Sequence, residues 1–285
     1  MLIDNCRSLF MVRRLSWTFL GAIIALHVVL TTFLNLVVFR YKWLDPITSA
    51  TRGFASGTLV GNLFFLAIML GLLFKVGKLK PKDLALHGEP AQSIVFGVVW
   101  TATAIVLLHM SAFAFCIFSS AEVVWQWPNW SQIVGQFFGN AFYEELMFRA
   151  LLIPQLVLLI KKAKRKWSWA TCLLFALLAS QFVFALIHIP NRIYLGSYAT
   201  AASVIQDQVK VLIIGLLFAW VFLSTRNLYA AIGVHALVNK SVILIVLPSG
   251  DLILSVFLII PLAYLWNGFV NRSKTRAESL RLDRR

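Results

Sequence analysis

The sequence predicts an all-α integral membrane protein, built as one polytopic bundle of about eight transmembrane helices. Of its 285 residues, 60% are hydrophobic and only 13% are charged. The mean hydropathy of +0.83 lies well above that of soluble globular domains. Apolar stretches of about 20 residues, the length that crosses the hydrocarbon core, follow one another with short loops between them. We therefore expect a single transmembrane domain over residues 1–285.

The spans themselves follow from a scan for apolar runs of this length. The first run comes after a basic N-terminal segment, but it is too long for a signal peptide and has no small-residue cleavage site, so we expect it to remain as a span. The loops are too short to fold alone, which places any chemistry among the helices. In chain order, the predicted spans cover approximately residues 16–39, 54–76, 91–118, 132–160, 168–189, 203–225, 228–247 and 251–270, and a basic tail covers 271–285.

The basic residues predict how the bundle is oriented. With the N-terminus inside, 19 lysines and arginines fall in the cytoplasmic segments and 4 in the opposite ones. Cytoplasmic loops carry this excess, so we expect both termini to be cytoplasmic in the inner or plasma membrane. The net charge of +15 then reflects topology and contact with anionic lipid rather than binding to nucleic acid. Cys6, Cys116 and Cys172 have no paired spacing, and we expect three buried thiols.

One predicted span contains three charged side chains within six residues. The stretch NAFYEELMFR includes Glu144, Glu145 and Arg149, and a charge at the centre of a bilayer costs about 2.5 to 3.5 kcal/mol on insertion scales. Residues four apart share a helix face, so Glu145 should pair with Arg149. Glu144 is about 140° away from Arg149 around the helix and should point elsewhere. Taken alone, the segment also fits a buried ion-pair network that only fixes helix packing.

Two later spans add polar residues at helical spacing. Phe184 lies four residues before His188, and Pro190 should end or bend the helix beside that histidine. His235 and Asn239 lie four residues apart on one face of the seventh span. Each of these motifs alone is also compatible with interhelical hydrogen bonding. We assign His27 and His109 to packing or interface roles.

Taken together, the three motifs resemble the CPBP family of intramembrane proteases, which includes type II CAAX prenyl endopeptidases and Abi-like bacteriocin-processing or immunity proteins. The matching residues are Glu144, Glu145 and Arg149, then Phe184 and His188, then His235 and Asn239. They occur in the family's order, and the resemblance covers roughly residues 130–250. It implies a peptide or protein substrate in the membrane, either membrane-associated or lipid-modified.

Peptide hydrolysis needs an activated water, a donor to the oxyanion and a proton for the leaving amine. Glu144, which Arg149 does not neutralise, is the expected general base, and His188 should orient and polarise the same water. His235 and Asn239 offer N–H donors for the oxyanion. The resemblance implies the same catalytic roles for these four residues, with Glu145, Arg149 and Phe184 supporting them. No cofactor is expected.

Other interpretations remain open. Two histidines and a glutamate can bind zinc, although no H-E-x-x-H motif is present and asparagine is a poor zinc ligand. A catalytically silent peptide-binding or bacteriocin-immunity protein could use the same polar cluster, and a transporter is disfavoured because the halves show no repeat. The predicted spans also place Glu144, His188 and His235 at different depths, so they meet only if the fifth or seventh span is kinked or sunk. Asp207 and Lys210, near the start of the sixth span, are spaced to pair at i, i+3, and we expect both to be interfacial.

Overall fold

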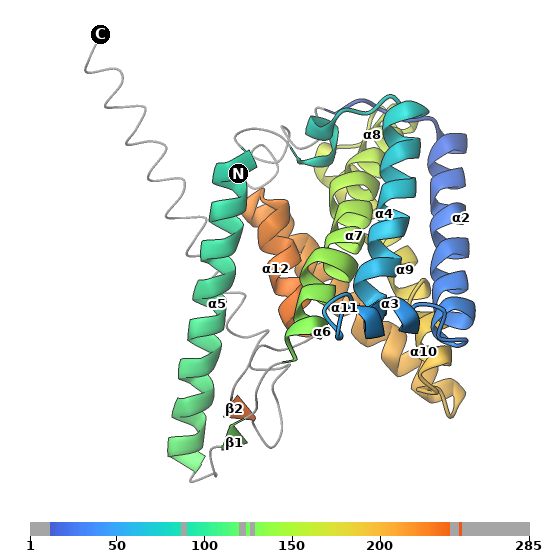
Figure 1. The fold of residues 1–285 in the computed structure, drawn as a ribbon. Coiled ribbons are helices and arrows are strands. Elements are labelled where there is room, and N and C mark those ends of the chain that lie inside the picture. The colour runs from blue at the N-terminus through green and yellow to red at the C-terminus, as the bar shows by residue number, and fades with distance from the viewer. Residues whose placement is uncertain (1–11, 87–89, 120–123, 126–128, 240–244, 247–285) are drawn as a thin grey trace.

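A computed structural model describes residues 12–86, 90–119, 124–125, 129–239 and 245–246, and most of these residues are helical (Figure 1). Turns and loops connect the helices, and β1 (Val124–Trp125) pairs with β2 (Ile245–Val246) in a short antiparallel arrangement. The first half of the chain forms α2 (Trp17–Phe33), η2 (Leu34–Phe39), α3 (Asp45–Ala50), α4 (Gly57–Lys75), η3 (Pro81–Leu84) and α5 (Pro90–Ser119). The all-α prediction is confirmed.

The second half of the chain begins with one unbroken helical stretch from Trp130 to Ala163. It consists of α6 (Trp130–Val134), η4 (Gly135–Asn140), α7 (Ala141–Glu145), η5 (Leu146–Leu152) and α8 (Ile153–Ala163). The remaining helices are α9 (Trp169–Leu186), α10 (Ile189–Tyr194), α11 (Ala201–Thr225) and α12 (Leu228–Asn239).

Four described helices are long and apolar enough to cross a membrane: Trp17–Phe39, Gly57–Lys75, Trp169–Tyr194 and Ala201–Thr225. They correspond to the first, second, fifth and sixth predicted spans. α5 and the Trp130–Ala163 stretch correspond to the third and fourth. The seventh prediction is wrong at its end, because the described helix stops at Asn239 and Ile245 and Val246 are extended. The eighth predicted span, 251–270, lies outside the described residues.

Side chains that cap the helix N-termini explain where several helices begin. A serine or threonine hydroxyl accepts a hydrogen bond from the backbone N–H three residues later, which satisfies one of the donors left open at a helix start. Four helices share this arrangement, with the caps Ser16 before α2, Ser56 before α4, Ser168 before α9 and Thr200 before α11.

Two π-helical segments, η4 and η5, flank the single α-helical turn of α7. π-helical turns are rare and frequently occur at functional sites. Glu144, the predicted general base, and Glu145, a predicted supporting residue, both lie in α7. The helix therefore departs from regular α-helical geometry on both sides of Glu144 and Glu145.

Small residues bring the neighbouring helices close to the site. A Cβ atom added at Gly139 of η4 would lie 3.0 Å from backbone atoms of Thr58 and Leu59 in α4, and one added at Gly233 of α12 would overlap Thr101 of α5. Such small residues at interfaces let membrane helices approach closely. α4 and α5 are thereby held against the elements that carry the site.

The two later motifs reach α7 because α9 breaks and α12 lies deep in the bundle. α9 ends at Leu186, and after His188 a short helix, α10, begins with Pro190 in its first turn, which confirms the predicted break. α12 lies between α5 and the α6–α7 part of the long helix, not beside α8 (Figure 1). The break in the fifth span is one of the two changes that would let the three motifs meet.

Candidate active site

The predicted pair of Glu145 and Arg149 is confirmed. Arg149 Nη1 lies 3.1 Å from Glu145 Oε1, and neither side chain is exposed. Arg149 Nη2 also donates to Gln181 Oε1 at 3.2 Å and to the carbonyl oxygen of Gly215 at 2.9 Å. The guanidinium carbon lies 4.4 Å from the ring centroid of Phe184. Arg149 thus links η5 to α9 and α11 through buried polar contacts.

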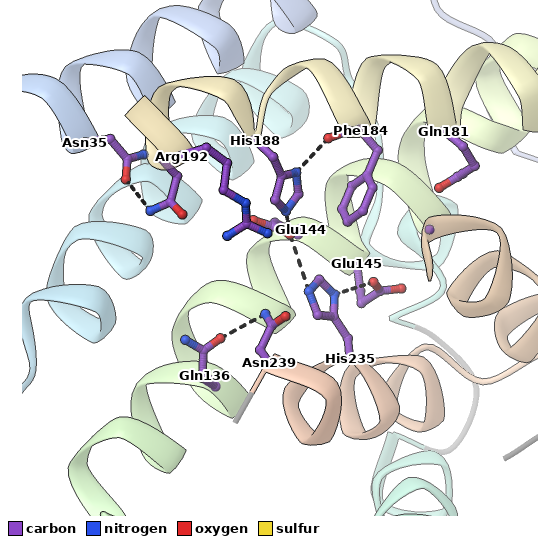
Figure 2. A network of polar contacts seen from close by, with 12 residues as sticks. Asn35, Gln136, Glu144, Glu145, Gln181, Phe184, His188, Arg192, His235 and Asn239 are labelled. Atoms are coloured by element: carbon purple, nitrogen blue, oxygen red, sulfur yellow. Dashed lines mark hydrogen bonds and ion pairs between the residues drawn. The ribbon is translucent and has the colours of Figure 1, made fainter. Parts of the chain in front are cut away.

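His235 contacts both glutamates (Figure 2). Its Nδ1 lies 2.7 Å from Glu145 Oε1, and its Nε2 lies 3.5 Å from Glu144 Oε2. The ring stacks on Phe218 of α11 with centroids 4.4 Å apart and is almost fully buried. Its hydrogen bond to the Arg149-bound Glu145 fixes the direction in which Nε2 points.

His188 faces Glu144 from the other side, between α9 and α10. Its Nε2 lies 3.8 Å from Glu144 Oε2, and its Nδ1 lies 2.7 Å from the carbonyl oxygen of Phe184. A carbonyl oxygen can only accept, so the proton must be on Nδ1 of His188. The His188 side chain is 17% exposed and that of Glu144 is 11% exposed, whereas Glu145 and His235 are closed off. Glu144 is therefore the more accessible of the two glutamates, and one of its oxygens lies between two imidazoles.

Asn239 lies at the edge of this cluster. It is exposed at the end of α12, and its Nδ2 donates to Gln136 Oε1 at 3.1 Å (Figure 2). Of the four predicted catalytic residues, Glu144, His188 and His235 converge directly. Asn239 follows His235 by one turn, and its side-chain hydrogen bond is with Gln136 of η4 rather than with these three side chains.

The expected pair of Asp207 and Lys210 is wrong. Asp207 instead pairs with Arg192, whose Nε lies 3.2 Å from both carboxylate oxygens, and it accepts a hydrogen bond from Tyr198. Burial, together with this bond to Asp207, raises the pKa of Tyr198, which lies in the loop before α11. Arg192 lies one turn beyond His188, where the break after α9 turns it toward α11. Asp207 of α11 is therefore paired with a residue of α10 rather than with Lys210 on its own helix.

The sequence analysis missed several polar partners of the predicted residues. Gln181 could have been recognised, because it precedes Phe184 by three residues and His188 by seven, which places all three on one helix face. Gln136 and the carbonyl of Gly215 offered no comparable pattern. Cys172 is buried with a free thiol, as expected. Cys6 lies outside the described residues, and the side-chain surroundings of Cys116 are also outside them.

Fold and site together define an integral membrane protein of apolar helices around a buried glutamate and histidine cluster. Residues 125–241 match the family model of the type II CAAX prenyl endopeptidases, described as Rce1-like. This match confirms the predicted family resemblance, and it contains all three motifs that carried it. The searches of curated proteins and of solved structures gave no match to the chain.

Proposed function

We propose that the protein is an intramembrane endopeptidase that hydrolyses peptide bonds of membrane-associated or lipid-modified peptides. The observation that carries this proposal is the position of Glu144 Oε2, between Nε2 of His188 at 3.8 Å and Nε2 of His235 at 3.5 Å. A carboxylate flanked by two imidazoles can activate a water and later protonate a leaving amine. The matched family is described as CAAX prenyl endopeptidases, which supports a prenylated peptide as the first substrate to test.

The hydrogen bonds of the two histidines support this chemistry. His188 donates from Nδ1 to a carbonyl oxygen, and Nδ1 of His235 is bonded to the Glu145 carboxylate. In the neutral rings, both Nε2 atoms then present lone pairs toward Glu144. Three acceptors facing one another need hydrogens between them, and a water molecule can supply them. We infer that the attacking water binds here, with Glu144 taking its proton.

The oxyanion must then be stabilised by donors. Asn239 carries an amide N–H beside the cluster, and we assign it that role. Because Nδ1 of His235 is bonded to Glu145, its Nε2 can donate only when the ring is protonated. His235 would therefore contribute to oxyanion stabilisation after it shares the proton taken from water. The same proton can go on to the leaving amine.

Zinc remains the alternative to a metal-free mechanism, since the three acceptors belong to residue types that bind it. Among the described residues, no group of three or more His, Cys, Asp or Glu side chains is placed to hold a metal ion. We propose a mechanism that needs no metal. Enzyme stripped with a chelator and then assayed with and without zinc tests this choice, and activity restored by zinc alone would overturn it.

The site lies among membrane helices, so we propose that its substrates reach it from the lipid bilayer and that nucleic acid is not a partner. Following the distribution of basic residues, we place both termini in the cytoplasm, in the inner or plasma membrane. Residues 1–285 would then act as one transmembrane domain.

The decisive experiment uses purified protein in detergent or vesicles with a library of membrane peptides that includes prenylated peptides ending in a CAAX sequence. Wild type should release cleaved product, and Glu144→Gln should lower the rate by at least about 100-fold, because it removes the general base. His188→Ala and His235→Ala should each reduce it as well. Equal product from Glu144→Gln would refute the role of Glu144, and peptide binding without cleavage by wild type would indicate a silent binding protein instead.

A further inference from the structure

A third histidine reaches α7 from a different helix. His27 lies on α2, and its Nδ1 shares a hydrogen bond of 2.6 Å with the hydroxyl of Tyr143. Both side chains are only 2% exposed. Tyr143 directly precedes Glu144 in the chain. The buried bond therefore ends one residue away from the proposed general base.

The surroundings of His27 show that this bond has a cost. The ring packs edge-on against Phe148 with centroids 5.5 Å apart, and its Nε2 has no hydrogen-bond partner among the described residues. His27 also borders a small apolar cavity together with Leu20 and Val183. A buried polar atom without a partner costs about 1 to 3 kcal/mol. An apolar side chain would fill the same space without that cost, so the hydrogen bond to Tyr143 is the distinctive feature of this histidine.

Three consecutive side chains of α7 each meet a histidine from a different part of the bundle. Tyr143 contacts the histidine of α2, Glu144 faces the one that follows α9, and Glu145 bonds the one of α12. Successive residues of an α-helix point about 100° apart, so the three contacts surround the axis of α7. Fixing Tyr143 and Glu145 therefore fixes the rotation of the turn between them.

This restraint matters because α7 is a single turn between two π-helical segments. Its rotation is not set by a long regular helix on either side. Glu144 Oε2 itself has no hydrogen-bond partner among the described residues. The hydrogen bond that the carboxylate makes with Asn140 stays within the same helical stretch, so the direction of the carboxylate still depends on how the turn is held. Glu145 supplies one anchor through Arg149 and α12, and Tyr143 can supply the other through α2.

We propose that His27 and Tyr143 are positioning residues, whose hydrogen bond holds α7 in the rotation that directs Glu144 toward His188 and His235. This inference rests on the proposed function of Glu144. His27 lies outside the segment that matches the protease family, residues 125–241. A residue of the N-terminal helix would thereby take part in the chemistry without touching the substrate.

The test measures kcat and KM on the prenylated peptide library described above, beside thermal unfolding in detergent. Tyr143→Phe and His27→Leu remove the bond from either side. Each should lower kcat by about 10-fold to 100-fold with KM changed less than about twofold, because the base is misplaced by less than about 1 Å while substrate binding is intact. The double variant should be no slower than the slower single variant, since both remove one interaction.

Two further variants separate positioning from general loss of packing. His27→Asn keeps a hydrogen-bonding group near the place of Nδ1 and should restore most of kcat. Leu20→Ala loosens the packing of α2 beside the same cavity without touching the bond, and it should lower the unfolding temperature while leaving kcat unchanged.

The outcomes distinguish the two proposals. Normal kcat in Tyr143→Phe, beside an inactive Glu144→Gln, would overturn the positioning role alone. An equal loss of kcat in Leu20→Ala and Tyr143→Phe would show that α2 acts only through packing. No cleavage by wild type, or full cleavage by Glu144→Gln, would overturn the proposed function and the inference with it.

Discussion

Arg149 shows at the scale of one residue how a charge can be kept inside a membrane bundle. Its side chain is fully buried, and it is held by an ion pair with Glu145, by Gln181, by a backbone carbonyl and by aromatic faces. Removing one partner of a buried ion pair leaves the other charge without compensation. Glu145 also bonds His235, so such a loss would extend into the site.

We therefore expect Arg149→Met to destabilise the protein by about 3 to 5 kcal/mol. Denaturant unfolding in detergent measures this loss. The matched control is the double variant with Glu145→Gln, which leaves no unpaired charge and should recover part of the lost stability. A single variant that unfolds like wild type would show that the pair adds nothing to the fold.

Local spacing predicted part of this residue-level picture. The i, i+4 rule identified the pair of Glu145 and Arg149 and correctly turned Glu144 away from it. The i, i+3 spacing of Asp207 and Lys210 did not predict the partner of Asp207, because Arg192 and Tyr198 contact it from outside its own helix. Gly215 and Gln136 could not be foreseen either, since their contacts join segments far apart in the chain.

At the scale of elements, the contact of α12 with α5 sets where His235 lies. Gly233 precedes His235 by two residues, and the space beside it is filled by Thr101 of α5. Asn227 strengthens the same contact, because its side chain donates to the carbonyl of Ser93 while accepting from the first N–H groups of α12. The position of α12 is thus fixed by close packing in its middle and by a cap at its N-terminal end.

Replacing Gly233 with valine should push α12 away from α5. We expect a destabilisation of about 1 to 3 kcal/mol from overpacking, together with loss of peptide cleavage as His235 moves away from Glu144. Unfolding in detergent and the peptide assay measure the two effects. Gly71→Ala is the control, because a Cβ there has open space around it; similar losses in both variants would contradict the role of the close contact.

Elements were predictable to different degrees. Pro190 predicted the break after α9, because proline disfavours helical geometry in the residue before it. The π-helical segments beside α7 were not predicted, since π and α turns are built from the same apolar residues and only tertiary packing separates them. The extended pair Ile245 and Val246 was also hidden, because the apolar run of the seventh span continues through these residues.

At the scale of the whole molecule, the orientation in the membrane is the main testable property. Lys164 follows α8 at one end of the bundle, and Tyr41 lies after η2, on the side of α3 and α10 (Figure 1). We expect single cysteines at these two positions to react with a membrane-impermeant reagent from opposite sides, with Lys164→Cys protected in intact cells. Cys6, Cys116 and Cys172 are replaced by serine in the background, and equal labelling of both positions would contradict the orientation.

Hydropathy alone predicted most of the spans, because crossing a bilayer requires a fixed apolar length. Their relative depths could not be predicted in this way. Spans drawn from one boundary to the other placed Glu144 and His235 at different levels, whereas His235 Nε2 lies 3.5 Å from Glu144 Oε2. The depth of each helix depends on side-chain contacts between helices, and the hydropathy pattern along the chain does not contain those contacts.

The convergence of separate helices on α7 has a consequence for how the chain is made. Glu144 is synthesised near the middle of the chain, His188 follows 44 residues later, and His235 and Asn239 arrive with α12, the last described helix. No shorter piece of the chain contains all four residues. For the proposed protease, the site would therefore form only once α12 is in place, and assembly would itself serve as the safeguard that a separate propeptide gives to other proteases.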